Sequence, residues 1–300
     1  MLNYEEFKDA IVSQIKDYLP SEYVDSEVKI HTVLKNNSTK LDGLTIRKSE
    51  SSICPNIYLN QFFSDYEDGR DIEDILSDIA RVRQMHDAPA DLDVSAITDF
   101  SRVKDKIAAK LINTEQNKEY LEDKPHTDIA DLSAVYYIEL GSDSSGTMST
   151  VITSGLLSQY GITVEELHEI AVQNMGPKAR FCSMFEVLSE LMGANMPDEM
   201  QESDNMMYVL TNDSKTNGAA MLLVPSTMDK IAEQLGSTSY YIIPSSIHET
   251  IFVKSNDSMN VKDLKSMIHE VNSTELSRAD ILSENLYIYD YDRHSIVAAA

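Results

Sequence analysis

The sequence predicts an α+β fold in which antiparallel hairpins are followed by helices that cover one face of a sheet. Pairs of β-prone segments flank short polar turns, and amphipathic segments follow several of these pairs. This strand–strand–helix order recurs up to four times at irregular spacing, which is typical of repeated architectural units rather than of a solenoid. Hairpins are expected at residues 28–34 with 41–47, 133–140 with 147–153, 206–211 with 218–224, and 239–243 with 247–253.

The helices are predicted from apolar residues that recur every three or four positions. The clearest pattern begins with Tyr4, Phe7 and Ile11 and stops at Pro20, which cannot continue a helix. At residues 163–174, Thr163 and Glu166 have the spacing of a capping box. Further helices are expected at 56–63, 72–82, 102–112, 180–192, 226–235 and 261–271, and a last strand at 286–291.

The domain organisation is predicted from local composition. Residues 87–96 have the composition of a linker, and the segment 113–125 is charged and weakly patterned. We place the boundary near residue 120. This gives an N-terminal helix and hairpin region over 1–120 and a C-terminal α+β domain over 121–300. The alternative is one continuous globule.

The charge balance restricts the partners. The chain has 300 residues, with 50 acids against 25 bases and a formal net charge of −25. Direct binding to nucleic acid is not expected, because affinity for phosphates comes from Lys and Arg. The acidity would suit a basic protein partner or mimicry of nucleic acid, although it also serves solubility alone.

The sequence also bears on location. The N-terminal segment is acidic where a signal peptide requires a basic start, and no apolar run approaches the ~20 residues that span a bilayer. The two cysteines, Cys54 and Cys182, are far apart and form no CxxC motif. A cytoplasmic protein without membrane contact is therefore expected.

Known metal and phosphate motifs are incomplete. His168, His248 and His269 each precede Glu, yet none has the second His of an HExxH motif. Gly141 and Gly146 have the spacing of a P-loop without its Lys. Neither a metal nor a cofactor is expected.

One turn has the residue types of a catalytic site. Ser245, Ser246, His248 and Glu249 lie between two apolar strands and combine hydroxyls, a base and a carboxylate. The structural interpretation is a tight turn in which the serines bond to nearby backbone groups. It is the favoured one, because a catalytic triad is defined in space and not by adjacency in the sequence.

Several stretches resemble an uncharacterised bacterial family, domain of unknown function 5688. The resemblance covers nearly the whole chain, and it marks Asn212 and the turn at 244–249 as recurring features without implying an activity. The stretches are Tyr4–Lys8, Val33–Asn37, Leu41–Ile46, Pro55–Asn60, Glu165–Leu167, Ala171–Asn174, Leu210–Asn212, Gly218–Ala220, Ile243–Glu249 and Val271–Asn272.

The favoured functional hypothesis is a non-enzymatic cytoplasmic protein that binds another macromolecule. A basic partner would first be sought at the acidic helical face of Asp71, Asp74 and Asp78, and Asn212 is a further binding candidate. One alternative is a hydrolase that uses the serines, His248 and Glu249. Another is an acidic mimic of nucleic acid. The sequence does not indicate an oligomeric state.

Overall fold

The computed structural model describes residues 1–48, 54–86, 94–143, 146–193, 207–254 and 260–299. The chain divides into two compact units. The first comprises Met1–Lys35 and Thr39–Ala96, and the second comprises Asn36–Ser38 and Ile97–Ala300. The division thus falls between Ala96 and Ile97 rather than near residue 120, and the expected linker lies mostly outside the described residues.

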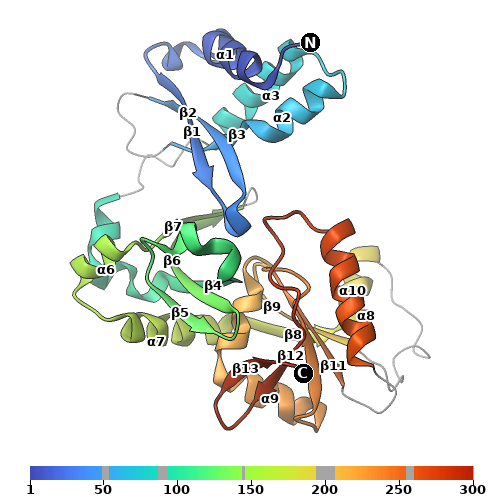
Figure 1. The fold of residues 1–300 in the computed structure, drawn as a ribbon. Helices are drawn as coiled ribbons and strands as arrows, with labels where there is room; N and C mark the ends of the chain where they lie inside the picture. Colours follow the sequence, from blue (N-terminus) through green and yellow to red (C-terminus); the bar gives the residue numbers. More distant parts are fainter. Residues whose placement is uncertain (49–53, 87–93, 144–145, 194–206, 255–259, 300) are drawn as a thin grey trace. The chain divides into compact units, whose positions relative to one another are not determined.

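The first unit is a small antiparallel sheet with helices on one face (Figure 1). The strand order is β1-β2-β3, and β1 pairs with β2 from Glu27 opposite Arg47 to Leu34 opposite Lys40. The elements are β1 (Glu27–Leu34), β2 (Lys40–Arg47), β3 (Ile57–Tyr58), α1 (Tyr4–Gln14), the 3₁₀ helix η1 (Ile15–Tyr18), α2 (Leu59–Glu67) and α3 (Ile72–Met85).

Amphipathic periodicity explains how this unit buries its core. Asn3 and Glu6 form a capping box that fixes the start of α1. The apolar stripe of α1 then packs on the inward side chains of β2, where Leu44 and Ile46 are fully buried. The same core includes Ile75, Leu76 and Ile79 of α3. The opposite side of α3 is consequently left to polar residues.

The second unit contains two antiparallel sheets. One has the order β4-β6-β5 with β7 paired to β6, and the other has the order β13-β12-β10-β11-β9-β8. Its strands are β4 (Ile107–Asn113), β5 (His126–Ile129), β6 (Leu132–Asp143), β7 (Gly146–Val151), β8 (Ala179–Ser183), β9 (Met207–Asn212), β10 (Tyr240–Ile243), β11 (Thr250–Lys254), β12 (Tyr287–Asp290) and β13 (Ser295–Ala298).

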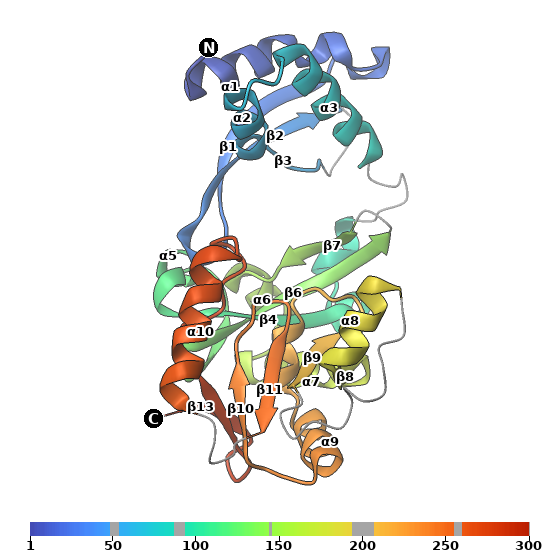
Figure 2. The ribbon, with the colours of Figure 1, turned by 90° about the vertical axis from the view of Figure 1, so that its right-hand side faces the viewer.

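Helices of the second unit pack against both sheets. A common core joins residues of β4 and β6 to α7, α9 and the six-stranded sheet. The other face of the six-stranded sheet packs against α10 through Leu264 and Ile268 (Figure 2). The helices are α4 (Phe100–Val103), α5 (Lys118–Leu121), α6 (Ser154–Tyr160), α7 (Val164–Met175), α8 (Met184–Met192), α9 (Pro225–Leu235), α10 (Val261–Thr274) and the 3₁₀ helices η5 (Lys104–Lys106), η7 (Gly176–Lys178) and η9 (Gly218–Leu223).

The predicted α+β class is confirmed, whereas the repeated strand–strand–helix unit is not. The expected helix at 102–112 is wrong, because residues 107–113 form β4 and pair with β6. The expected strand at 218–224 is instead the buried 3₁₀ helix η9. The expected helix at 180–192 begins only at Met184, after the strand β8.

A single carboxylate connects the two sheets of the second unit. Asp131, in the turn between β5 and β6, accepts hydrogen bonds from the side chains of Asn113, Ser283, Asn285 and Tyr287. The shortest is from the Tyr287 hydroxyl, at 2.6 Å. Burial is the main reason why the pKa of Tyr287 lies above its usual value. This network fixes the segment that leads from α10 into β12.

A second buried network connects α7 to β5 and β6. The hydroxyl of Tyr136, a fully buried side chain, lies 2.6 Å from Thr127 Oγ1 and 3.0 Å from His168 Nδ1. Burial raises the pKa of Tyr136 to about 12 and lowers the pKa of His168. The neutral imidazole and the Tyr136 hydroxyl therefore share one hydrogen bond, in which either group can donate. Glu169, also on α7, partly opposes the effect of burial on His168.

The lowered pKa of His168 predicts a dependence of stability on pH. The unfolded chain takes up a proton near the ordinary His pKa of ~6.5, before the folded protein does. The stabilisation is therefore complete above that pH and is lost as the pH falls toward the folded pKa. In His168→Gln this proton uptake is absent, so the unfolding free energies of the two proteins should converge on acidification. Urea unfolding at about pH 7.5 and about pH 5.5 measures this, and parallel profiles would contradict it.

Candidate functional site

The turn between β10 and β11 is closed by its own serines. Ser246 N–H donates to the carbonyl of Glu249 at 3.1 Å, and Ser246 Oγ accepts from His248 N–H at 3.0 Å. The Ser246 side chain is buried. Ser245 Oγ makes a longer bond, of 3.5 Å, to Glu249 Oε1. Both hydroxyls are thus engaged within the turn.

The imidazole of His248 is held at both ring nitrogens. Nδ1 accepts the backbone N–H of Asn217 at 3.1 Å, which places the proton of the neutral ring on Nε2. Nε2 faces Asp280 Oδ1 at 3.4 Å. In the described part of the chain, no hydrogen bond joins either serine hydroxyl to this ring. A serine nucleophile needs such a bond to a base, although active sites often tighten only when substrate binds.

Asn212 shapes the loop that presents Asn217 to the imidazole. Its Oδ1 accepts from Thr216 N–H at 3.1 Å and from the Ser214 hydroxyl, while Nδ2 donates to the Thr216 carbonyl at 2.7 Å. Asn217 follows with a left-handed φ of 56°. Asn212 and the turn at 244–249 are separate candidates in the sequence. In the structure the loop closed by Asn212 contacts the turn, because Asn217 bonds to His248.

The two segments also touch through Thr211 and Gly218. Thr211 Oγ1 donates to the His248 carbonyl at 2.8 Å. The backbone of Gly218 passes so close that a Cβ there would lie 2.4 Å from the same carbonyl. Only glycine fits such an approach. The loop at 211–218 and the turn at 244–249 thus form one hydrogen-bonded junction. His248 and Asp280, which face each other at this junction, are both partly exposed.

The three acids of the predicted helical face lie along one stripe of α3. Asp71 precedes its first turn, and Asp74 and Asp78 follow at helical spacing. Asp71 and Asp74 are exposed. Asp78 is half-buried and forms ion pairs with Arg70 and Arg81. The hydrogen bond from Arg70 is the main cause that lowers the pKa of Asp78. The stripe is therefore acidic, with its third member neutralised.

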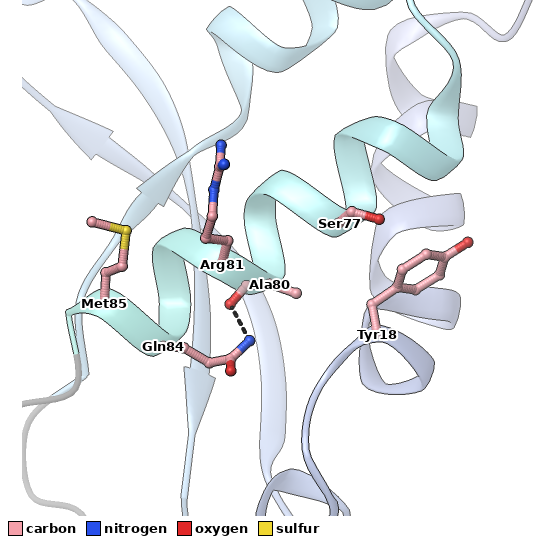
Figure 3. Close-up of a pocket in the computed structure, with 6 residues that line it drawn as sticks. All are labelled: Tyr18, Ser77, Ala80, Arg81, Gln84 and Met85. Atoms are coloured by element: carbon pink, nitrogen blue, oxygen red, sulfur yellow. Dashed lines mark hydrogen bonds between the residues drawn. The ribbon is translucent and has the colours of Figure 1, made fainter.

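A groove of about 420 Å³ lies beside this stripe, between η1 and α3 (Figure 3). Tyr18 faces it from η1, and Arg81 and Met85 line it from α3. Met85 is 66% exposed, so its thioether is accessible from solvent. Sequence reasoning missed this groove. The sequence signal that could have indicated it is that Arg81 and Met85 continue the helical spacing of Asp71, Asp74 and Asp78, and so lie on the same stripe of the helix.

The described residues contain neither a cluster of metal-ligating side chains nor a membrane-spanning helix. No group of three or more His, Cys, Asp or Glu side chains among them could hold a metal ion. The three His–Glu dipeptides lie apart, with His168 on Tyr136, His248 on Asp280, and His269 on Glu284 at 3.2 Å. None of the helices described is both long and apolar enough to cross a bilayer.

The close approach at Gly218 predicts a strong effect of one methyl group. In Gly218→Ala the Cβ would lie 2.3 Å from Thr211 Oγ1, so the junction must shift at a cost of about 1–3 kcal/mol or more. Gly155→Ala in α6 is the control, because its Cβ would meet only Thr153 Oγ1, at 3.9 Å, and alanine favours a helix by about 1 kcal/mol. Urea unfolding compares the two. Equal stability of Gly218→Ala and the unmodified chain would contradict the geometry.

Comparison with family models gives a match over nearly the whole chain. A family model described as a family of unknown function, DUF5688, matches residues 4–291. No curated protein and no solved structure matches the chain. The matched range includes α3, the Asn212 loop and the turn at 244–249. Because the model covers nearly the full length, the chain belongs to the DUF5688 family of unknown function.

Proposed function

We propose that the protein is a non-enzymatic binding protein of the cytoplasm that docks a basic segment of another protein on α3. The supporting observation is that exposed acids and a groove with an exposed methionine share this one helix. Asp71 and Asp74 supply negative charge at the start of α3, and Tyr18 and Met85 line the groove farther along the same helix. A basic segment with one apolar side chain is complementary to both parts.

The energetic roles of the two parts differ. Exposed carboxylates accelerate association with a basic partner and contribute little each to affinity, because water and salt screen them. Burial of Met85 and of the Tyr18 ring would contribute most of the affinity, at about 25 cal/mol per Å² of apolar surface. Methionine suits such a surface, because its flexible thioether adapts to different partners. The net charge of −25 adds long-range attraction.

The hydrolase alternative has less support. The cavity that contains Asn212 is lined by Lys106, Glu139 and Lys178 among others, and not by Ser246 or His248. Ser246 is buried and accepts a backbone hydrogen bond, and both ring nitrogens of His248 are occupied. A nucleic-acid mimic would present the same acids of α3 to its partner, but the groove lined by Tyr18 and Met85 would have no role in that function.

The proposal predicts that neutralising Asp71 and Asp74 weakens peptide binding more than neutralising two acids elsewhere on the surface. The full chain is titrated at low salt with a fluorescein-labelled amphipathic helical peptide built from Lys and Leu. Asp71→Asn with Asp74→Asn should weaken binding about threefold to tenfold, as expected for the loss of two exposed charge contacts. Met85→Ala should also weaken binding, although it leaves the charge unchanged. Fluorescence anisotropy measures each affinity.

The matched control is Glu233→Gln with Glu270→Gln, which removes the same charge from exposed positions on α9 and α10. This control should bind the peptide as the unmodified chain does. Equal losses in both double variants, with no effect of Met85→Ala, would mean that the peptide senses only net charge. That result would contradict docking on α3.

A further inference from the structure

A groove of about 490 Å³ in the second unit, the polar groove, is lined mostly by polar and charged residues and by no residue of the turn at 244–249. Its volume is within the range of ~300–1,000 Å³ that is usual for small-molecule sites. Four separate chain segments contribute to it. The lining residues that matter here are Asp105, Lys106, Glu139, Lys178, Asn212 and Asp213.

Two amide side chains hold the walls of this groove in place. Asn174 on α7 donates to the carbonyls of Lys104 and Ile107, at 2.8 and 2.9 Å, and so fixes the η5 turn between them. Asn212 closes the opposite loop through its bonds to Thr216. The two walls are therefore pre-organised, which reduces the entropy lost when a ligand binds.

The other segments that line the groove are positioned by a β-bulge in β6 and by a backbone hydrogen bond. The register of β6 against β7 shifts between Glu139 and Gly141, so the strand has a bulge where it lines the groove. Such bulges are frequent beside binding sites, because they redirect side chains. The N–H of Asp213 donates to the carbonyl of Lys178 at 3.2 Å and joins two of the segments. Gly141 leaves open space, with no atom within 4 Å of a would-be Cβ.

The charges at this groove are of both signs and are not all paired. Lys178 Nζ lies 2.6 Å from Glu139 Oε2, so this pair is neutralised. Asp105, Lys106 and Asp213 are exposed, and within the described residues none of the three forms an ion pair. A rigid groove that holds two free carboxylates and one free ammonium is complementary to a ligand that carries both charges.

We propose that this groove binds a zwitterionic small molecule, namely an amino acid or a short peptide with free ends. The ammonium of the ligand is held by Asp105 and Asp213, and its carboxylate by Lys106. The Lys178–Glu139 pair forms the polar floor. The proposal is independent of docking on α3, because no residue is shared between the two surfaces.

The test uses the dipeptide alanylalanine and two blocked forms, N-acetyl-alanylalanine and alanylalanine amide, titrated into the full chain by isothermal calorimetry. The free dipeptide should bind saturably in the millimolar range or tighter. Each blocked form should bind about tenfold more weakly, since each has lost one charge-assisted contact. The Asp213→Asn and Lys106→Gln variants should each bind the free dipeptide more weakly than the unmodified chain does.

The variants also assign the contacts. Lys106→Gln should remove the preference for the free carboxylate and leave the preference for the free ammonium. Asp213→Asn should reduce the preference for the free ammonium, because Asp105 remains, and leave the preference for the free carboxylate. Lys262→Gln and Asp263→Asn, exposed positions on α10 outside the groove, are matched controls that should bind as the unmodified chain does. Thermal melting confirms that each variant is folded. Absence of saturable dipeptide binding, equal affinity for all three forms, or binding unaffected by both groove variants would each overturn the proposal.

Discussion

The four hydrogen bonds to the Asp131 carboxylate are the constraint on which the second unit depends. They come from β4, from residues 283 and 285, and from β12, so one side chain sets how three segments meet. The network is partly buried, and loss of Asp131 would leave the buried donors Ser283 and Tyr287 without their acceptor, at the cost of their desolvation. The segment that leads into β12 is fixed as a result, and it carries Asp280.

Asp280 transmits this constraint to the turn between β10 and β11. Its carbonyl accepts the N–H of Ile247 at 2.9 Å, and its carboxylate faces His248. His248 in turn receives the N–H of Asn217 from the loop that Asn212 closes. The residues that carry the family resemblance in this region therefore support one another. Their hydrogen bonds hold the junction together, and in the described residues neither serine hydroxyl is bonded to the ring of His248.

The sequence predicted those elements whose local pattern agrees with their tertiary environment. The first hairpin and α7 with its Thr163 cap formed as expected, because alternation, periodicity and capping are local signals. The strand β4 was missed, because Ala108, Ala109 and Leu111 favour a helix and only pairing with β6 makes them a strand. The strand predicted at 218–224 failed for a related reason, since its apolar run marks burial and not a conformation.

The candidate sites were less predictable than the fold. The three acids of α3 follow from helical spacing, but the ion pairs of Asp78 depend on the rotamers of Arg70 and Arg81. The partner of His248 at Asp280 is remote in the sequence, and no pattern links the two. The polar groove is assembled from four segments by the bonds of Asn174 and Asn212 to backbone carbonyls and amides. Such bonds leave no periodic trace in a sequence.

The buried phenols also give the protein an optical property. The chain has 15 Tyr and no Trp, so tyrosine alone determines its near-ultraviolet absorption and its intrinsic fluorescence. Tyr136 and Tyr287 are fully buried and resist ionisation, whereas a phenol in water loses its proton near pH ~10. The tyrosinate absorbance in alkali should therefore rise in two stages. The first reports phenols that solvent already reaches, and the second reports phenols that become accessible on unfolding, most of which lie in the second unit. The chain thus contains its own spectroscopic probe of whether its second unit is intact.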